Sequence, residues 1–146
     1  MKVEFNNLYT HFIFTTLHRD PLIQEKNRER IEKYITGIIN NRGCHLYAIY
    51  ANPDHIHFLV SRAPDIDEKR LATLVANIST KFINENNLCG FQFHWQETCS
   101  AFSVSKGEVD RVCKYILNQP KHHEKHSFQD EYDAFLKFYQ KTIKPK

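Results

Sequence analysis

Long hydrophobic runs are missing from this chain of 146 residues. No apolar run approaches the roughly 20 residues that a membrane helix needs, and Glu4, close to two asparagines, stands where a secretory signal would be apolar. Glycine and proline are scarce, with four and five residues, which excludes a collagen-like or low-complexity chain. We therefore expect a protein that stays in the cytoplasm and has no membrane partner.

Paired cysteine motifs are also missing. Because the four cysteines are scattered without a CxxC pair, we expect free, half-buried thiols in a reducing compartment: Cys44, Cys89, Cys99 and Cys113. One alternative is that Cys89, His94 and Cys99 form part of a zinc site, although their spacing is irregular.

The rest of the composition is that of an ordinary globular protein. Hydrophobic residues make up 41% and charged residues 25%, and the length suits one domain, which we expect to span residues 1–146. A net charge of +3 permits nucleic-acid binding without indicating it. Nine histidines and an aromatic share of 13% are more informative, because metal ligation and base stacking use these residue types.

Alternating apolar side chains, many of them β-branched or aromatic, mark the strands that we expect. The pattern predicts strands over residues 8–16, 45–50 and 55–60. A further strand region covers residues 91–95 and 101–104, with an interruption between these two parts. The short connection between the second and third strands favours an antiparallel hairpin.

Two long segments have the apolar spacing of helices. The first begins at Asp20-Pro21 and ends before Gly43, with an isoleucine-rich face. The second begins with a capping box of Asp65 and Glu68 and is closed by Asn86-Asn87. Its inner face is formed by five apolar residues: Leu71, Leu74, Val75, Ile78 and Phe82.

The order strand, helix, strand, strand, helix, strand predicts an α+β fold of the ferredoxin-like, split βαβ type, with both helices on one face of an antiparallel sheet. The other face needs a cover. A capping box of Ser105 and Glu108 predicts a helix that ends near Gln119, since Pro120 follows. A last helix offers an apolar stripe to the body or to a second subunit: Phe128, Tyr132, Phe135, Leu136 and Tyr139.

Two histidines on the third strand are candidate metal ligands. His55 and His57 are two residues apart, so both imidazoles project from one face and can share one metal ion. The residues between and after them, Ile56, Phe58 and Val60, point into the core. A bare His-x-His pair also fits two histidines on an open sheet face, so the pair alone does not identify a metal site.

Tyr115 is the candidate nucleophile because of its place on the predicted cover helix. At about 100° per residue, Arg111, Tyr115 and Gln119 align on a ridge that offers a phosphate contact, a nucleophile and an oxygen ligand. This ridge is separate from the apolar arc of the helix, which consists of Val109, Val112, Cys113, Ile116 and Leu117. A partly exposed tyrosine on an amphipathic helix is the simpler explanation that the ridge competes with.

These motifs resemble those of a known family. His55-Ile56-His57 resembles the His-hydrophobic-His signature of the HUH nucleases. The run from Tyr115 to Gln119 resembles the tyrosine helix of their small transposase branch, the insertion-sequence-200/605 type, which includes repeat-associated tyrosine transposases. The similarity extends over most of the chain, through His11, Arg19-Asp20-Pro21-Leu22, residues 52–59, Trp95-Gln96, residues 102–105 and residues 118–123. The chain departs from its relatives at Thr98-Cys99-Ser100, where many of them carry Gly-Tyr-Gly.

The resemblance implies a transposase that cuts and rejoins single-stranded DNA. It implies a divalent metal ion, Mg²⁺ or Mn²⁺, held by His55, His57 and Gln119. Tyr115 would form a 5′-phosphotyrosine intermediate and leave a free 3′-OH. The resemblance also implies a bacterial homodimer that acts on single-stranded DNA with hairpin ends. Two imidazoles and an amide oxygen suit Mn²⁺ better than Mg²⁺.

Basic residues on the predicted helices are candidates for phosphate contacts. Lys69 and Arg70 belong to this set, together with the four that we favour: Lys81, Arg111, Lys114 and Lys121. A charged residue on a helix is more often merely solvated, so the four are not ranked against one another.

Three other functions remain open. Ferredoxin-like sheets also serve as non-catalytic nucleic-acid-binding modules, although this chain has no RNP-type aromatic motif. A metal hydrolase that activates water would need acidic ligands, for which Asp54 is the candidate. A domesticated relative would cut DNA without moving its own element.

Overall fold

The structure, a computed structural model, describes residues 1–121, 127, 129–134 and 137. Its centre is a four-stranded antiparallel sheet in the order β2-β3-β1-β4. One helix follows β1 and another follows β3, so the predicted split βαβ fold is confirmed. The strands are β1 (Tyr9–Thr15), β2 (His45–Ala51), β3 (His55–Ser61) and β4 (Ser100–Val104).

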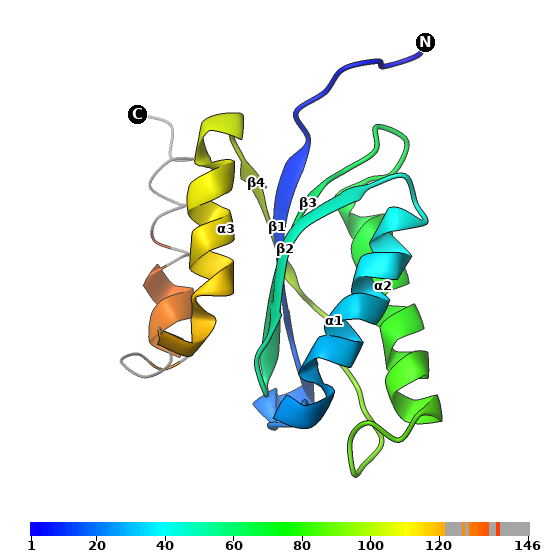
Figure 1. Ribbon diagram of the computed structural model, residues 1–146, viewed down its shortest axis with the longest axis vertical. Coiled ribbons are helices and arrows are strands. Elements are labelled where there is room, and N and C mark those ends of the chain that lie inside the picture. Colours follow the sequence, from blue (N-terminus) through cyan, green and yellow to red (C-terminus); the bar gives the residue numbers. More distant parts are fainter. Residues whose placement is uncertain (122–126, 128, 135–136, 138–146) are drawn as a thin grey trace.

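Helices cover both faces of the sheet (Figure 1). α1 (Glu25–Asn40) and α2 (Glu68–Glu85) lie on one face, and α3 (Val109–Leu117) lies on the other. Because strand side chains alternate between the faces, Phe12 and Phe58 point toward α1 and α2 and are fully buried in the main core. The predicted sheet, with two helices on one face and a separate tyrosine-bearing helix, is therefore confirmed.

The apolar faces of α1 and α2 are close to the predicted ones. In α1 the isoleucines are buried, whereas Tyr34 stays 39% exposed and stacks on Phe82 of α2. In α2, Leu71 and Val75 are buried as predicted, but Ile83 fills the core in place of Phe82. The stacking of Phe82 on Tyr34 at the outer surface of the helix pair accounts for this difference.

The first helix begins later than the sequence predicts. α1 starts after Asp20-Pro21, because a 3-10 turn, η1 (Leu17–Arg19), comes first. The hydroxyl of Thr16 then donates to the backbone oxygens of Asp20 and Asp54, at 2.6 and 3.2 Å. α1 itself begins at Glu25, after the extended N-cap residue Gln24.

Neither predicted capping box forms. The carboxylate of Asp67, and not that of Asp65, accepts a hydrogen bond from the Arg70 amide at 2.7 Å at the start of α2. Ser105 makes no side-chain cap bond, because a 3-10 turn, η2 (Lys106–Glu108), precedes α3. The helices nevertheless lie where the hydrophobic pattern predicts them, since packing of an apolar face decides helix position more than a cap does.

The predicted strand over residues 91–95 is largely wrong. Within this segment Trp95 alone forms a bridge, with Thr16. The side chain of Asn84 satisfies the backbone of Phe93 instead: it donates to the carbonyl at 3.1 Å and accepts from the amide at 2.7 Å. Tied to α2 in this way, the segment covers the edge of the main core and does not extend the sheet.

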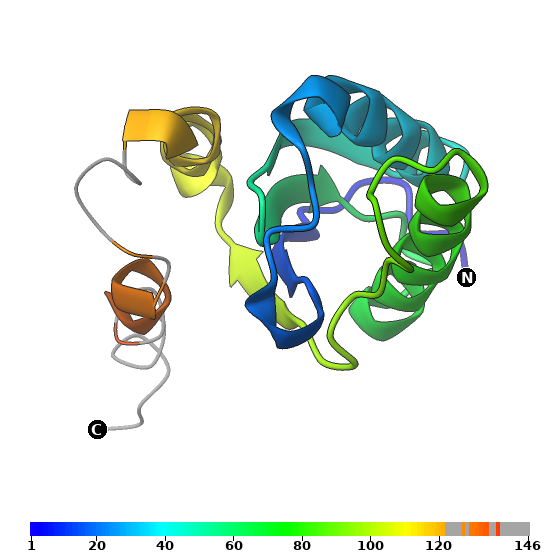
Figure 2. The same ribbon diagram turned by 90° about the horizontal axis from the view of Figure 1, so that it is seen from below.

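The last predicted helix lies partly within the described residues. Residues 129–134 are helical and lie on the same side of the sheet as α3 (Figure 2). The Tyr132 hydroxyl hydrogen-bonds to that of Ser100 in β4, so this segment contacts the body, which is one of the two predicted alternatives. The rest of the predicted stripe, and a histidine pair of the family resemblance, lie outside the described residues: Phe128, Phe135, Leu136, Tyr139, His122 and His123.

The cysteines are free thiols, as predicted, but only Cys113 is half-buried: Cys44 and Cys89 are buried and Cys99 is exposed. The alternative zinc site is wrong, because the described residues do not bring Cys89, His94 and Cys99 together as a ligand group. Cys89 Sγ instead contacts the carbonyl of Phe91 at 2.9 Å. As for membrane spans, the described helices include none of sufficient length and apolarity to cross a bilayer.

Candidate metal and nucleophile site

The two histidines of β3 lie in the middle of the sheet, on the face that α3 covers. His55 is 1% exposed and His57 is fully buried. They pair across the sheet with Thr15 and Ile13 of β1. Because residues alternate along a strand, Ile56 enters the main core while both imidazoles project from the opposite face. The two imidazoles therefore project from the same face of the strand, as the spacing predicts.

Each imidazole is held through its Nδ1 atom by a second side chain. His57 Nδ1 lies 3.0 Å from Nε2 of the buried His11, and His55 Nδ1 lies 2.7 Å from a carboxylate oxygen of Asp54. Burial, and next the neighbouring His57, hold the pKa of His11 well below its usual value, so this side chain is neutral. Partners of this kind orient histidines that bind metals through the other ring nitrogen.

A third potential ligand comes from the helical segment over residues 129–134. The carboxylate of Glu131 lies 2.7 Å from His57 Nε2, and the ligand atoms of His55, His57 and Glu131 are all within 4.8 Å of one another. Burial disfavours the charged carboxylate, but hydrogen bonding and charge from His57 outweigh it and lower the pKa of Glu131 to about 2. Sequence reasoning missed this residue, because one glutamate in a charged helix gives no signal.

Gln119, the predicted third ligand, also reaches the group. Its side chain is fully buried, and its Oε1 accepts a hydrogen bond from Asn52 Nδ2 at 3.2 Å. The same Asn52 nitrogen lies 3.2 Å from His55 Nε2. Asn52 therefore connects the end of α3 to the histidine pair, a role that its place before Asp54 and His55 in the sequence did not reveal.

Tyr115 meets the same group from α3. Its ring centroid lies 5.7 Å from that of His57, at an interplanar angle of 81°, and its hydroxyl is buried. Burial, and next a hydrogen bond and the charge of Glu131, raise the pKa of Tyr115 well above its usual value. The phenol is therefore protonated while Glu131 holds this position.

Two of the four predicted phosphate-binding residues, Arg111 and Lys81, do not point to this group. Arg111 is 77% exposed and pairs with Glu108 at 3.1 Å, so the predicted ridge of α3 is divided: Tyr115 and Gln119 face the sheet, and Arg111 faces solvent. Lys81 lies on α2, across the sheet from the histidines. The predicted apolar arc of α3 is also shorter than expected, because Leu117 is 60% exposed. The two other candidates, Lys114 and Lys121, are exposed and stand just before Tyr115 and just after Gln119 in the sequence.

The donor atoms suit a divalent cation. Two imidazole nitrogens and a carboxylate converge, and the amide oxygen of Gln119 is close by. A mixed set of nitrogen and oxygen donors binds Mn²⁺ and other first-row metals, and the carboxylate is also a ligand that Mg²⁺ accepts. A carboxylate as buried as that of Glu131 also requires positive charge nearby, which such a cation would supply.

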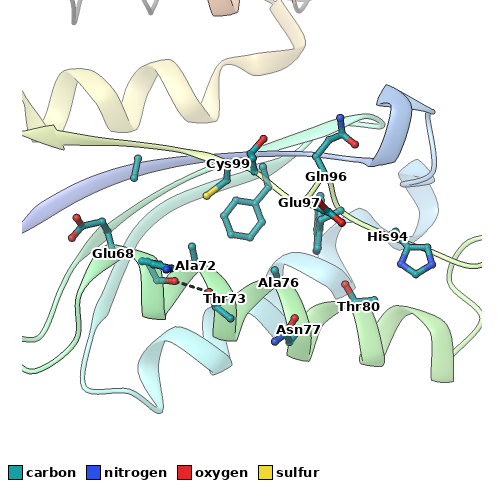
Figure 3. A pocket seen from close by; sticks show the side chains of 15 residues that line it. Glu68, Ala72, Thr73, Ala76, Asn77, Thr80, His94, Gln96, Glu97 and Cys99 are labelled. Carbon is teal, nitrogen blue, oxygen red and sulfur yellow. Dashed lines mark hydrogen bonds between the residues drawn. The ribbon is translucent and has the colours of Figure 1, made fainter.

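A hollow of about 630 Å³ lies on the other face of the sheet, away from the histidines and Tyr115. It is formed between α2 and the segment that leads to β4. Figure 3 shows Thr73 and Asn77 of α2 on one wall and Gln96 and Glu97 on the other. Phe14 also lines it, which places it on the core side of the sheet.

Comparison with known proteins finds a matching family and solved structures with a similar fold. Residues 4–119 match the family described as "Transposase IS200 like", a range that includes both histidines, Tyr115 and Gln119 but ends before Glu131. A crystal structure of a candidate transposase from Deinococcus radiodurans R1 has 18% identity and a TM-score of 0.64, over 82% of this chain and 95% of that one. No curated protein matches the chain.

A second solved structure is that of a REP-associated tyrosine transposase bound to a REP hairpin. It has 15% identity and a TM-score of 0.60, over 84% of this chain and 72% of that one. At such identities both structures show a common fold, an antiparallel sheet of four strands with helices, and no more than that.

Proposed function

The chain belongs to the IS200-like transposase family, and we propose that it cuts and rejoins single-stranded DNA through a covalent bond to Tyr115. The observation that carries this proposal is the meeting of a tyrosine hydroxyl with a buried group of metal-ligand type. His55, His57 and Gln119 would hold the cation, and Glu131 would add a carboxylate. A tyrosine with a merely structural role has no need of such neighbours.

The reaction would exchange one phosphate ester for another. The phenol oxygen of Tyr115 bonds to phosphorus, the bond from phosphorus to the 3′ oxygen breaks, and that oxygen gains a proton as the phenol loses one. When bound, a divalent cation neutralises charge on the phosphoryl oxygens and favours the ionised phenol. Because an ester replaces an ester, attack by a 3′-OH on the phosphotyrosine reseals the strand without ATP.

The chain's own residues position these groups. His11 and Asp54 fix the ring orientations of His57 and His55 through their Nδ1 atoms. Asn52 couples His55 to Gln119, which follows the nucleophile by four residues. Placement of the nucleophile and closure of the cation site are therefore linked through the end of α3.

The substrate that we propose is single-stranded DNA with hairpin ends, acted on by a homodimer. The solved REP-associated transposase, which shares this fold, is bound to a REP hairpin. Two exposed basic residues that flank Tyr115 in the sequence, Lys114 and Lys121, suit contacts with the DNA backbone.

A denaturing gel tests the proposed function. The protein is incubated with end-labelled single-stranded DNA and Mn²⁺, and we expect a labelled species that migrates as protein joined to DNA. Cleavage without this adduct would indicate a hydrolase that uses water. Binding without cleavage in either Mn²⁺ or Mg²⁺ would indicate a nucleic-acid-binding module and would overturn the proposal.

We expect Gln119→Ala to lower the affinity for Mn²⁺ by about 10- to 100-fold and to slow cleavage in limiting Mn²⁺. The change removes an oxygen ligand and takes one of the two hydrogen-bond partners from the buried Nδ2 of Asn52, which costs about 1–3 kcal/mol of stability. Gln119→Glu keeps an oxygen ligand and should retain part of the activity. Calorimetric titration with Mn²⁺ measures the affinities, and equal values for the wild type and Gln119→Ala would exclude Gln119 as a ligand.

We expect His11→Phe to weaken Mn²⁺ binding by about 10- to 100-fold although His11 itself binds no metal in this proposal. The ring that remains fills the same space but offers no hydrogen bond to His57 Nδ1. His45→Phe, on the exposed end of β2, is the matched control and should bind Mn²⁺ like the wild type. If His11→Phe keeps the wild-type affinity, the contact between the two histidines does not position His57.

A further inference from the structure

A small polar hollow lies directly beside the histidine pair, on the same face of the sheet. Its volume is about 180 Å³. Ile13 and Thr15 of β1 form part of its wall, and these are the residues that pair across the sheet with His57 and His55. Other parts of the wall come from η1, from the loop before β4, from the start of β4 and from the segment over residues 129–134: Arg19, Gln96, Thr98, Cys99, Ser100 and Tyr132.

The chemistry of this wall suits an anion. Arg19 is the only charged side chain among the described residues that line the hollow. Hydroxyl groups of Thr15 and Thr98 add hydrogen-bond donors around it, and the hydroxyls of Ser100 and Tyr132, which bond to each other, lie on the same wall. A planar guanidinium with neutral donors is a combination that proteins use to bind phosphate groups.

Arg19 is held in place by an unusual backbone. Both His18 and Arg19 have left-handed conformations, with φ of 58° and 57°, which non-glycine residues rarely adopt. The loop is fixed by Thr16, which bonds to the backbone of Asp20. The guanidinium donates to the side chain of Gln129 at 2.6 Å, on the segment that also carries Glu131. Strained conformations of this kind concentrate at sites that hold a ligand.

We propose that Arg19 and this hollow bind a backbone phosphate of single-stranded DNA, next to the phosphate that reacts with Tyr115. The inference rests on the proposed function for the identity of the substrate. A single strand that passes from the cation site across the sheet face would place a phosphodiester over Thr15 and Arg19. The site would recognise the charge of the backbone and not the identity of a base.

The test measures binding apart from chemistry. The Tyr115→Phe protein, which cannot form the adduct, is titrated with a fluorescent 20-nucleotide single strand by anisotropy, without metal and at several salt concentrations. Arg19→Gln in this background should weaken binding by about tenfold or more, because a charge-assisted hydrogen bond is lost. The slope of log affinity against log salt should fall by about 0.7, the value for one phosphate contact on a single strand.

Arg30→Gln is the matched control, because it removes the same charge from the surface of α1 across the sheet. Its affinity and salt slope should stay close to those of the parent protein. Arg19→Lys, which keeps the charge without the planar fork, should keep the slope and lose part of the affinity.

Arg19→Gly separates a ligand role from a structural one. Glycine accepts the left-handed conformation freely, so this variant should melt at the same or a higher temperature while it binds DNA as poorly as Arg19→Gln. The proposal is overturned if Arg19→Gln binds with the parent's affinity and salt slope, or if Arg30→Gln causes an equal loss. Failure of the proposed function gives a different result, since wild-type protein would then form no adduct while the Arg19 variants still lost binding.

Discussion

Tyr115→Phe is expected to abolish the covalent adduct and to reduce cleavage by about 10⁴-fold or more, as removal of a nucleophile does in other enzymes. The change removes one oxygen atom. The ring still packs beside His57 and among the small set of apolar residues between α3 and the sheet. Loss of the buried hydroxyl should change stability by about 1–2 kcal/mol at most. DNA binding should therefore persist while the chemistry is lost.

A denaturing gel with labelled single-stranded DNA and Mn²⁺ measures the adduct, and anisotropy measures binding. Tyr34→Phe is the matched control, because it removes a tyrosine hydroxyl on α1, across the sheet from the histidines, and keeps the ring that stacks on Phe82. That control should still form the adduct. An adduct in Tyr115→Phe would assign the nucleophile to another tyrosine, and loss of the adduct in Tyr34→Phe would show that the loss in Tyr115→Phe is not specific to the nucleophile.

His57→Ala is expected to cause the second largest loss, with Mn²⁺ binding weakened by 100-fold or more and cleavage abolished. His57 is the residue on which the site converges: His11 contacts its Nδ1 atom, and Glu131 contacts its Nε2 atom. Without it the Glu131 carboxylate loses its buried partner, which costs about 3–5 kcal/mol in comparable cases. The variant should therefore also melt at a lower temperature.

Thermal melts with and without Mn²⁺ separate the loss of the ligand from the loss of stability. A cation that binds the folded state raises the melting temperature of the wild type, and this rise should disappear in His57→Ala at any starting stability. His45→Ala, on β2, lies at an exposed position and should keep the full rise. A normal Mn²⁺-dependent rise in His57→Ala would mean that the cation binds elsewhere.

The order of the helices and strands could be predicted from the sequence because each element has one clear apolar face. The places where prediction fails are set by contacts between distant residues. Asn84 takes the backbone of Phe93 away from the sheet, and Thr16 bonds to the backbone of Asp20 and Asp54 in the turn that precedes α1. Neither set of contacts leaves a periodic signal, since each joins a single side chain to backbone groups.

In the candidate site, too, neighbours within one element could be predicted, whereas contacts between distant segments could not. The spacing of His55 and His57 on one strand places both on one face, and the four-residue step from Tyr115 to Gln119 places these two on one side of α3. Glu131 could not be found in this way, because its approach to His57 depends on how a later segment folds back over the sheet. Sequence spacing reports neighbours within one element, whereas Glu131 becomes a neighbour through the tertiary fold.

The two faces of the sheet are packed very unequally. Among the described residues, α3 is joined to the sheet by five buried apolar side chains: Ala48, Leu59, Val104, Val109 and Ile116. The other face of the sheet shares the much larger main core with α1 and α2. Regions with few buried contacts open with a smaller free energy than the whole protein. Amide hydrogens of α3 should therefore exchange with solvent sooner than those of β1 and β3. On heating, the nucleophile would leave its place before the histidines do, so activity would fade at temperatures where most of the chain is still folded.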